Sequence, residues 1–102
     1  EKLLKEVISA DAQNHLAQYN LASLLKRRSR IDESLEHYGL ALEAKPNYAA
    51  AIYDFAILLD KNDELYPAVL NFKKFIHLMP RSKQAKVAKK RIEEIGRAPF
   101  RR

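Results

Sequence analysis

The chain has 102 residues, the size of one small domain, and its hydrophobic content of 47% is too high for a disordered protein. Two glycines and four prolines are too few for the turns of an all-β fold, and the absence of cysteine excludes disulfides and thiolate metal sites. The net charge of +6 is unevenly distributed, because residues 1–80 carry −1 and residues 81–102 carry +7. The positive excess therefore belongs to the C-terminal end.

Apolar residues recur at helical spacing in six segments. These segments cover residues 1–10, 14–28, 31–44, 48–60, 64–78 and 83–95. The turns between them are short, so consecutive helices must pack antiparallel. The sequence therefore predicts an all-α fold of about six helices, followed by a disordered basic tail at residues 97–102. No apolar run approaches the ~20 residues that span a bilayer.

The ends of these segments have local signals. Pro46 and Pro80 end two of them, because the residue before a proline is pushed out of the α region. The starts are expected at side chains that can cap the first turn. The predicted caps are Ser29 (in a capping box with Asp32), Asn47, Asp63 and Ser82.

The two prolines also reveal a period, since they are 34 residues apart. When residues 15–48 are superposed on residues 49–82, similar residue types coincide. The matching pairs are Leu21 with Phe55, Ala22 with Ala56, Leu25 with Leu59, Ser34 with Ala68, Tyr38 with Phe72 and Pro46 with Pro80. Small residues are needed where the two helices of a unit cross, because a larger side chain would hold the backbones apart.

This pattern resembles the tetratricopeptide repeat, a helix–turn–helix unit of 34 residues. The resemblance implies an α-solenoid of antiparallel helix pairs that form a right-handed superhelix. Residues 15–48 and 49–82 would be full repeats, residues 1–14 the second helix of a truncated repeat, and residues 83–96 a capping helix that fits when slipped back by one position. Because the chain starts at Glu1 inside an amphipathic pattern, we expect an earlier repeat to precede it.

The chain departs from the repeat pattern at a few positions. Gln18 and Ile52 replace the large aromatic residue that usually opens each repeat. The glycine of the turn is replaced by Ser29 and Asp63, and Phe75 occupies a small-residue position. We expect a degenerate repeat family to tolerate these changes.

In proteins of this family the first helix of each repeat lines a concave face. The positions that match its ligand-facing residues are Tyr19, Asn20 and Ser23 in one repeat and Tyr53, Asp54 and Ile57 in the next. Tyrosine suits peptide binding because it offers a large apolar area and a hydroxyl group. The alternative is that these residues only pack helices together. The charged clamp with which some members hold a terminal carboxylate is not expected, because Tyr19 and Ser23 stand at its first positions.

The last predicted helix adds a row of lysines on the side that would continue the groove. Lys83, Lys86 and Lys90 form this predicted basic rim, and Arg91 extends the positive field. The functional interpretation is an electrostatic rim for an acidic partner. The alternative is a solvated capping face, and "KRRSR" (26–30) is likewise interpreted as a solvated helix end.

Signals for catalysis are nearly absent. Glu33 and His37 lie one helical turn apart but lack a third metal ligand, and no phosphate-binding loop or nucleophile motif is present. The sequence therefore predicts a non-enzymatic, cofactor-free scaffold that binds another protein or a peptide. The alternative is contact with nucleic acid or an acidic surface through the basic C-terminal segment, although no aromatic residue apart from Phe100 is interleaved there. Self-association through the first helix is a third alternative. The sequence identifies no compartment, although it favours a soluble cytoplasmic domain.

Overall fold

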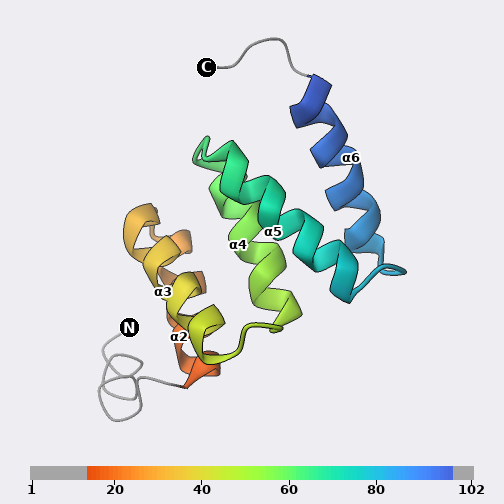
Figure 1. Cartoon of the computed structure of the whole chain (residues 1–102). Helices are drawn as coiled ribbons and strands as arrows, with labels where there is room; N and C mark the ends of the chain where they lie inside the picture. The colour runs from red at the N-terminus through yellow and green to blue at the C-terminus, as the bar shows by residue number, and fades with distance from the viewer. Residues whose placement is uncertain (1–13, 98–102) are drawn as a thin grey trace.

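A computed structural model describes residues 14–97, and all of its regular structure is α-helical. Figure 1 shows how the helices of the described residues are arranged. They are α2 (His15–Arg27), α3 (Ile31–Ala44), α4 (Ala49–Lys61), α5 (Leu65–Leu78) and α6 (Lys83–Arg97). These bounds lie within two residues of the predicted segments, and the all-α fold class is confirmed. The predicted helix at residues 1–10 and the tail after residue 97 lie outside the described residues.

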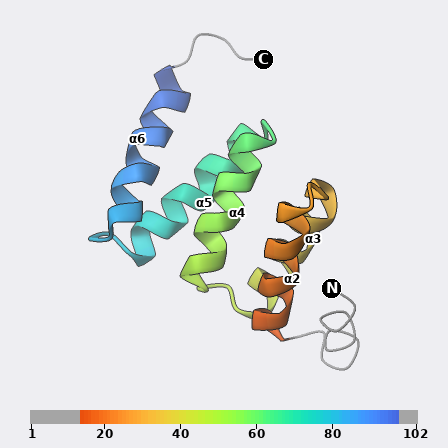
Figure 2. The ribbon, with the colours of Figure 1, turned by 180° about the vertical axis from the view of Figure 1, so that it is seen from behind.

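The helices form two layers. In Figure 1 α3 and α5 lie in front of α2 and α4, and Figure 2, seen from behind, reverses this order. Contacts follow the chain, because α2 packs on α3, α3 on α4, α4 on α5 and α5 on α6. The molecule is therefore built from consecutive helix pairs, with α6 added against the second pair.

The small residues predicted at the helix crossings are fully buried. Ala22 and Ser34 are both 0% exposed where α2 meets α3, and Ser34 Oγ donates a hydrogen bond of 2.7 Å to the Ala22 carbonyl. This direct contact of a side chain with the facing backbone leaves no room for a larger residue. Ala56 and Ala68 are likewise 0% exposed in the α4–α5 pair.

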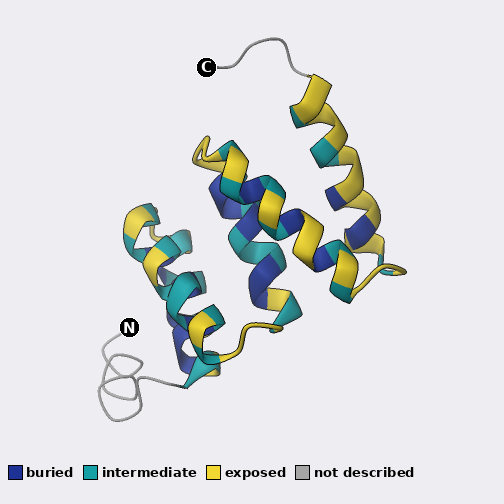
Figure 3. Ribbon diagram, viewed as in Figure 1, coloured by how far each residue is buried: buried dark blue, intermediate teal, exposed yellow. Residues whose placement is uncertain are grey.

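The core aromatics also follow the prediction. Tyr38 on α3 and Phe72 on α5 are both 0% exposed. Phe72 lies in a cluster with Ala56 and Leu59 of α4 and Ala88 of α6. Figure 3 shows this buried band between the layers and the exposed outer surface of α6. Each core therefore depends on residues from neighbouring helices.

Two predicted caps are wrong because they serve the turns instead. Ser29 and Asp63 each have φ of 61°, the left-handed conformation that usually favours glycine. The residues that cap α3 and α5 are Arg30 and Glu64, and neither makes a side-chain capping bond. Ser29 and Asp63 thus adopt the conformation of the turn glycine that they replace.

The other helix starts give a mixed result. Ser82 Oγ accepts a hydrogen bond of 3.0 Å from the amide of Ala85, as expected of a cap. Asn14 caps α2 in the same way, 3.0 Å from the amide of Ala17. The prediction for Asn47 is wrong, because α4 begins one residue later and is capped by Tyr48 without a side-chain bond.

Helix α6 is held by two kinds of contact. Ala85 and Ala88 are 0% exposed against the second helix pair. Arg91 forms a two-pronged ion pair with Asp60 of α4, with Nε–Oδ2 and Nη2–Oδ1 distances of 2.6 and 3.0 Å. Arg91 was expected to extend a free positive field, but this ion pair and a second contact with Glu94 largely neutralise it.

Candidate functional site: the face of the first helices

Two predicted groove residues, one on α2 and one on α4, meet directly. Tyr19 Oη donates a hydrogen bond of 2.5 Å to Asp54 Oδ2. The two residues are 35 positions apart in the chain, so the bond connects consecutive helix pairs. It fixes the Tyr19 ring on the face formed by α2 and α4 while both side chains stay partly exposed.

Other tyrosines surround this bond. The Tyr19 ring centroid lies 5.9 Å from that of Tyr38 and 5.2 Å from that of Tyr48. Burial and the hydrogen bond to Asp54 both raise the pKa of Tyr19 well above its usual range. Burial first, and then the Asp54 charge, also raise the pKa of Tyr48 and Tyr53. The phenols of this cluster are therefore neutral hydrogen-bonding groups at physiological pH.

Tyr53 has a different environment one repeat later. Its ring centroid lies 4.9 Å from that of Phe75 and 6.4 Å from that of Phe72, both on α5. The side chain is partly exposed, so one side of the ring packs on α5 and part of it remains open. Tyr53 thus both packs helices and contributes to the surface.

An open pocket lies beside Tyr53, with a volume of about 370 Å³. We call it the tyrosine pocket. Its lining residues are Ala49, Ala50, Tyr53 and Asp54 of α4, Phe75 and Met79 near the end of α5, and Gln84 of α6. The wall is mostly apolar, and Asp54 is its charged group. Such a mixture suits a side chain or short segment of a peptide.

The fold matches that of known repeat proteins. The crystal structure of YrrB, described as a TPR protein with an unusual peptide-binding site, superposes with a TM-score of 0.76. The chain has the tetratricopeptide repeat fold. The two sequences are 22% identical, and the match covers 85% of this chain and 45% of YrrB, so this chain spans about half the length of that protein. No protein-family model matches the sequence, and neither does any curated protein.

Within the tetratricopeptide repeat fold, the remaining groove predictions fall at separate places. Asn20 is exposed on α2. The Ser23 hydroxyl lies 3.4 Å from Tyr38 Oη, which ties it to the interior of the first repeat. Ile57 does not line the tyrosine pocket; it lines a second pocket at the other end of α4. Tyr19, Tyr53 and Asp54 are therefore the predicted residues that lie together.

The predicted basic rim lies on α6. Lys83, Lys86 and Lys90 are all exposed. The residue of α6 that enters the tyrosine pocket is their neighbour Gln84. The role of the three lysines stays a prediction.

Sequence reasoning missed several residues of the tyrosine pocket. Phe75, Met79 and Gln84 belong to α5, the turn after it and α6, whereas the predicted groove residues all lie on the first helices. One signal was present, because Phe75 stands where the preceding repeat has Ala41. The extra volume of this ring packs on Tyr53 and forms part of the pocket wall.

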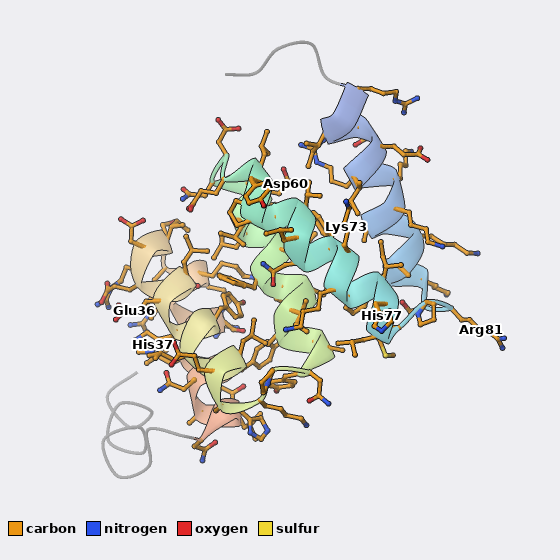
Figure 4. All side chains as sticks on the ribbon, viewed as in Figure 1. Glu36, His37, Asp60, Lys73, His77 and Arg81 are labelled. Carbon is orange, nitrogen blue, oxygen red and sulfur yellow. The ribbon has the colours of Figure 1, made fainter. Side chains whose placement is uncertain are left out.

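The surface of the second helices carries polar side chains beside the exposed Tyr66 and Leu70 of α5. Figure 4 shows Glu36 and His37 on α3 and Lys73 and His77 on α5 projecting from that side. His37 Nδ1 lies 2.7 Å from Oε1 of the buried Gln18, and Glu33 pairs with Arg30 at 2.6 Å.

Within residues 14–97, no three His, Cys, Asp or Glu side chains gather at a metal-binding distance. The same residues contain no helix with the length and apolar character needed to cross a bilayer.

Proposed function

We propose that this tetratricopeptide repeat domain is a non-catalytic scaffold that binds a peptide segment of another protein on the face formed by α2 and α4. Tyr19, Asn20, Ser23, Tyr53, Asp54 and Ile57 are the proposed contact residues. The observation that carries this proposal is the tyrosine pocket, because Tyr53 and Asp54 from α4 line an open, largely apolar hollow of about 370 Å³.

The physical basis is a preformed surface. Tyr19 is held by its bond to Asp54, and Tyr53 by its contact with Phe75, so neither ring has to be ordered again when a ligand arrives. Rigid aromatic anchors contribute most to binding when their conformational entropy is already lost. Leu16 on α2 is 53% exposed and adds apolar area to the same helix.

The repeat assignment is part of the proposal. Residues 15–48 and 49–82 would act as two repeats, and residues 83–96 as the cap that closes the second hydrophobic core. YrrB is a peptide-binding protein with the same fold, which supports a peptide or protein as the partner class.

The second candidate function is contact with nucleic acid or an acidic surface through α6. The exposure of Lys83, Lys86 and Lys90 supports it. Salt dependence distinguishes the two candidates, because phosphate-driven binding weakens steeply as salt rises, whereas binding in an apolar pocket persists.

The experiment is a selection of peptides on the 102-residue chain, followed by measurement of the dissociation constant of the best peptide by fluorescence polarisation. Ala50→Arg places a long side chain in the tyrosine pocket from an exposed position and should weaken binding at least tenfold. Tyr53→Ala should weaken it about thirtyfold, which corresponds to ~2 kcal/mol for an aromatic anchor.

The matched control is Tyr66→Ala on α5, a tyrosine that is 76% exposed on another helix. It should leave the affinity unchanged, and circular dichroism should show that every variant is folded. Unchanged affinity in Ala50→Arg and Tyr53→Ala would place the peptide elsewhere and refute the proposed face.

A further inference from the structure

A second pocket lies where the C-terminal ends of α2 and α4 meet the start of α3. Its volume is about 360 Å³. We call it the basic pocket. Its lining side chains include Lys26, Arg27, Ile31, Ile57, Leu58 and Lys61.

The floor of the basic pocket is apolar. Leu58 is 4% exposed and belongs to the core cluster of Ala22 and Tyr38, against which Ile31 also packs. Ile57 is partly buried. Open apolar surface next to a fixed core is suited to an apolar side chain from a partner, because burying such a side chain releases it from water.

The rim of the basic pocket is positively charged. Lys26, Arg27 and Lys61 form no ion pair with any residue of the described range 14–97. Asp60, the neighbour of Lys61, is engaged by Arg91 instead. Asn62, which also lines the pocket, donates a hydrogen bond of 2.7 Å to the carboxylate of Glu64. The described lining residues include three cations and no carboxylate, so the rim is positive.

Cations near a helix C-terminus have a structural role, because they offset the partial negative charge of the last carbonyl groups. That role explains one cation at the end of each helix. It does not explain why cations from two helices surround an open apolar floor. The combination of the two features points to a ligand with complementary chemistry.

We propose that the basic pocket binds an acidic peptide segment, with one large apolar side chain on the floor of Ile31, Ile57 and Leu58 and the flanking carboxylates on Lys26, Arg27 and Lys61. Because Ile57 also belongs to the proposed peptide-binding face, this inference rests on the proposed function and gives the ligand its charge. The acidic residues of the ligand would lie at the turn end of α2 and α4.

A peptide fits the pocket better than a nucleic acid does. Phosphate groups would satisfy the three cations but would leave the apolar floor uncovered. None of the described lining residues is aromatic, so no ring is available there for stacking on a base. An oligonucleotide therefore serves as a competing probe in the test.

The test uses the full 102-residue chain and a fluorescein-labelled probe peptide with one leucine between two glutamates on each side. Two control peptides replace the leucine by serine or all four glutamates by glutamine. A 12-nucleotide oligouridine is the nucleic-acid probe. We expect the probe peptide to bind at least tenfold more tightly than either control peptide and than the oligouridine at 150 mM salt.

The pocket variant is Lys26→Gln with Lys61→Gln, and its matched control is Lys73→Gln with Lys74→Gln on the exposed surface of α5. Both lose two positive charges. The pocket variant should weaken the probe peptide at least tenfold, and the α5 control less than twofold. Ile57→Ser should weaken it by a similar factor, and amide chemical shifts should change around Lys61 and Ile31.

The outcomes separate the two proposals. If the pocket variant and the α5 control lose the same affinity for the probe peptide, net charge alone binds the peptide. If the serine peptide or the oligouridine binds as tightly as the probe peptide, the apolar floor does not contribute to binding. Either result overturns the proposed role of the basic pocket. Absence of binding by the probe peptide would do the same. In each case, a selected peptide that still responds to Ala50→Arg would leave the proposed function standing, whereas insensitivity to that variant would remove it separately.

Discussion

The phenol of Tyr19 and the carboxylate of Asp54 join α2 and α4, the first helices of two consecutive helix pairs, through a hydrogen bond of 2.5 Å. The closest packing runs from α2 to α3 and from α3 to α4, and Ala22 of α2 also shares a core cluster with Leu58 of α4. The bond therefore contributes to the relative placement of two helices that carry the proposed binding face. It also gives Tyr19 a structural role besides its proposed contact with a ligand.

Tyr19→Phe should lower the free energy of unfolding by about 1–2 kcal/mol. The substitution keeps the ring but removes a hydrogen bond to a charged acceptor, and the partial exposure of Asp54 lets water replace some of the loss. Urea unfolding followed by circular dichroism measures the change. Tyr66→Phe, on a side chain that is 76% exposed, is the control and should change stability by less than ~0.5 kcal/mol.

Stability should fall at alkaline pH. The pKa values of Tyr19, Tyr38, Tyr48 and Tyr53 are all raised in the fold. Below pH 10, roughly the tyrosine pKa in the unfolded chain, both states are protonated and the stabilisation is complete. Above that pH the unfolded chain ionises first, so stability is lost as the pH rises toward the tyrosine pKa values of the folded protein. Urea midpoints from pH 8 to 11 should decline less steeply in Tyr19→Phe than in the parent. Identical slopes would contradict the role of Tyr19.

Phe72→Ala should destabilise the protein by about 3–5 kcal/mol, because it opens a cavity at a side chain that is 0% exposed between α4, α5 and α6. A short solenoid has few other contacts to compensate. Thermal unfolding should show a chain that is largely unfolded at 37 °C. Leu70→Ala on the same helix, where the side chain is 50% exposed, should leave the melting temperature almost unchanged.

Ser29→Gly should stabilise the protein by about 0.5–1 kcal/mol. Its φ of 61° costs a residue with a Cβ about 1–2 kcal/mol, which outweighs the entropy that glycine loses on folding. Ser29→Val should have the opposite effect, because a β-branched side chain tolerates this conformation poorly. Chemical denaturation of the pair tests the sign: if both variants shift the midpoint in the same direction, backbone conformation does not control this turn.

Arg91→Gln should loosen α6 without unfolding the repeats. The ion pair with Asp60 is partly exposed, with side-chain exposures of 31% and 14%, so its loss should cost about 1 kcal/mol. Hydrogen exchange should then show about fivefold less protection in the amides of α6 and little change in α3. Lys89→Gln, at an exposed position of the same helix, is the control that should leave protection unchanged.

The sequence by itself determined the helices and the way in which they pair. The 34-residue period, the apolar spacing and the small residues Ala22, Ser34, Ala56 and Ala68 are local properties. Each acts through helical geometry or through the closest approach of two adjacent helices, so they can be recognised without coordinates. Lys45 and Met79, which precede the prolines, lie outside the α region, with φ/ψ of −142°/89° and −131°/61°.

Only the tertiary structure decided how the candidate site is composed. Periodicity placed Tyr19, Tyr53 and Asp54 on one face, but it did not predict the hydrogen bond between Tyr19 and Asp54 or the position of Gln84 at the tyrosine pocket. It also did not predict the ion pair of Arg91 with Asp60, or that Lys26 and Lys61 lie around one apolar floor. These relationships join side chains from different helix pairs. They depend on the distance and angle between the pairs and on the reach of each rotamer, and a repeat period specifies neither.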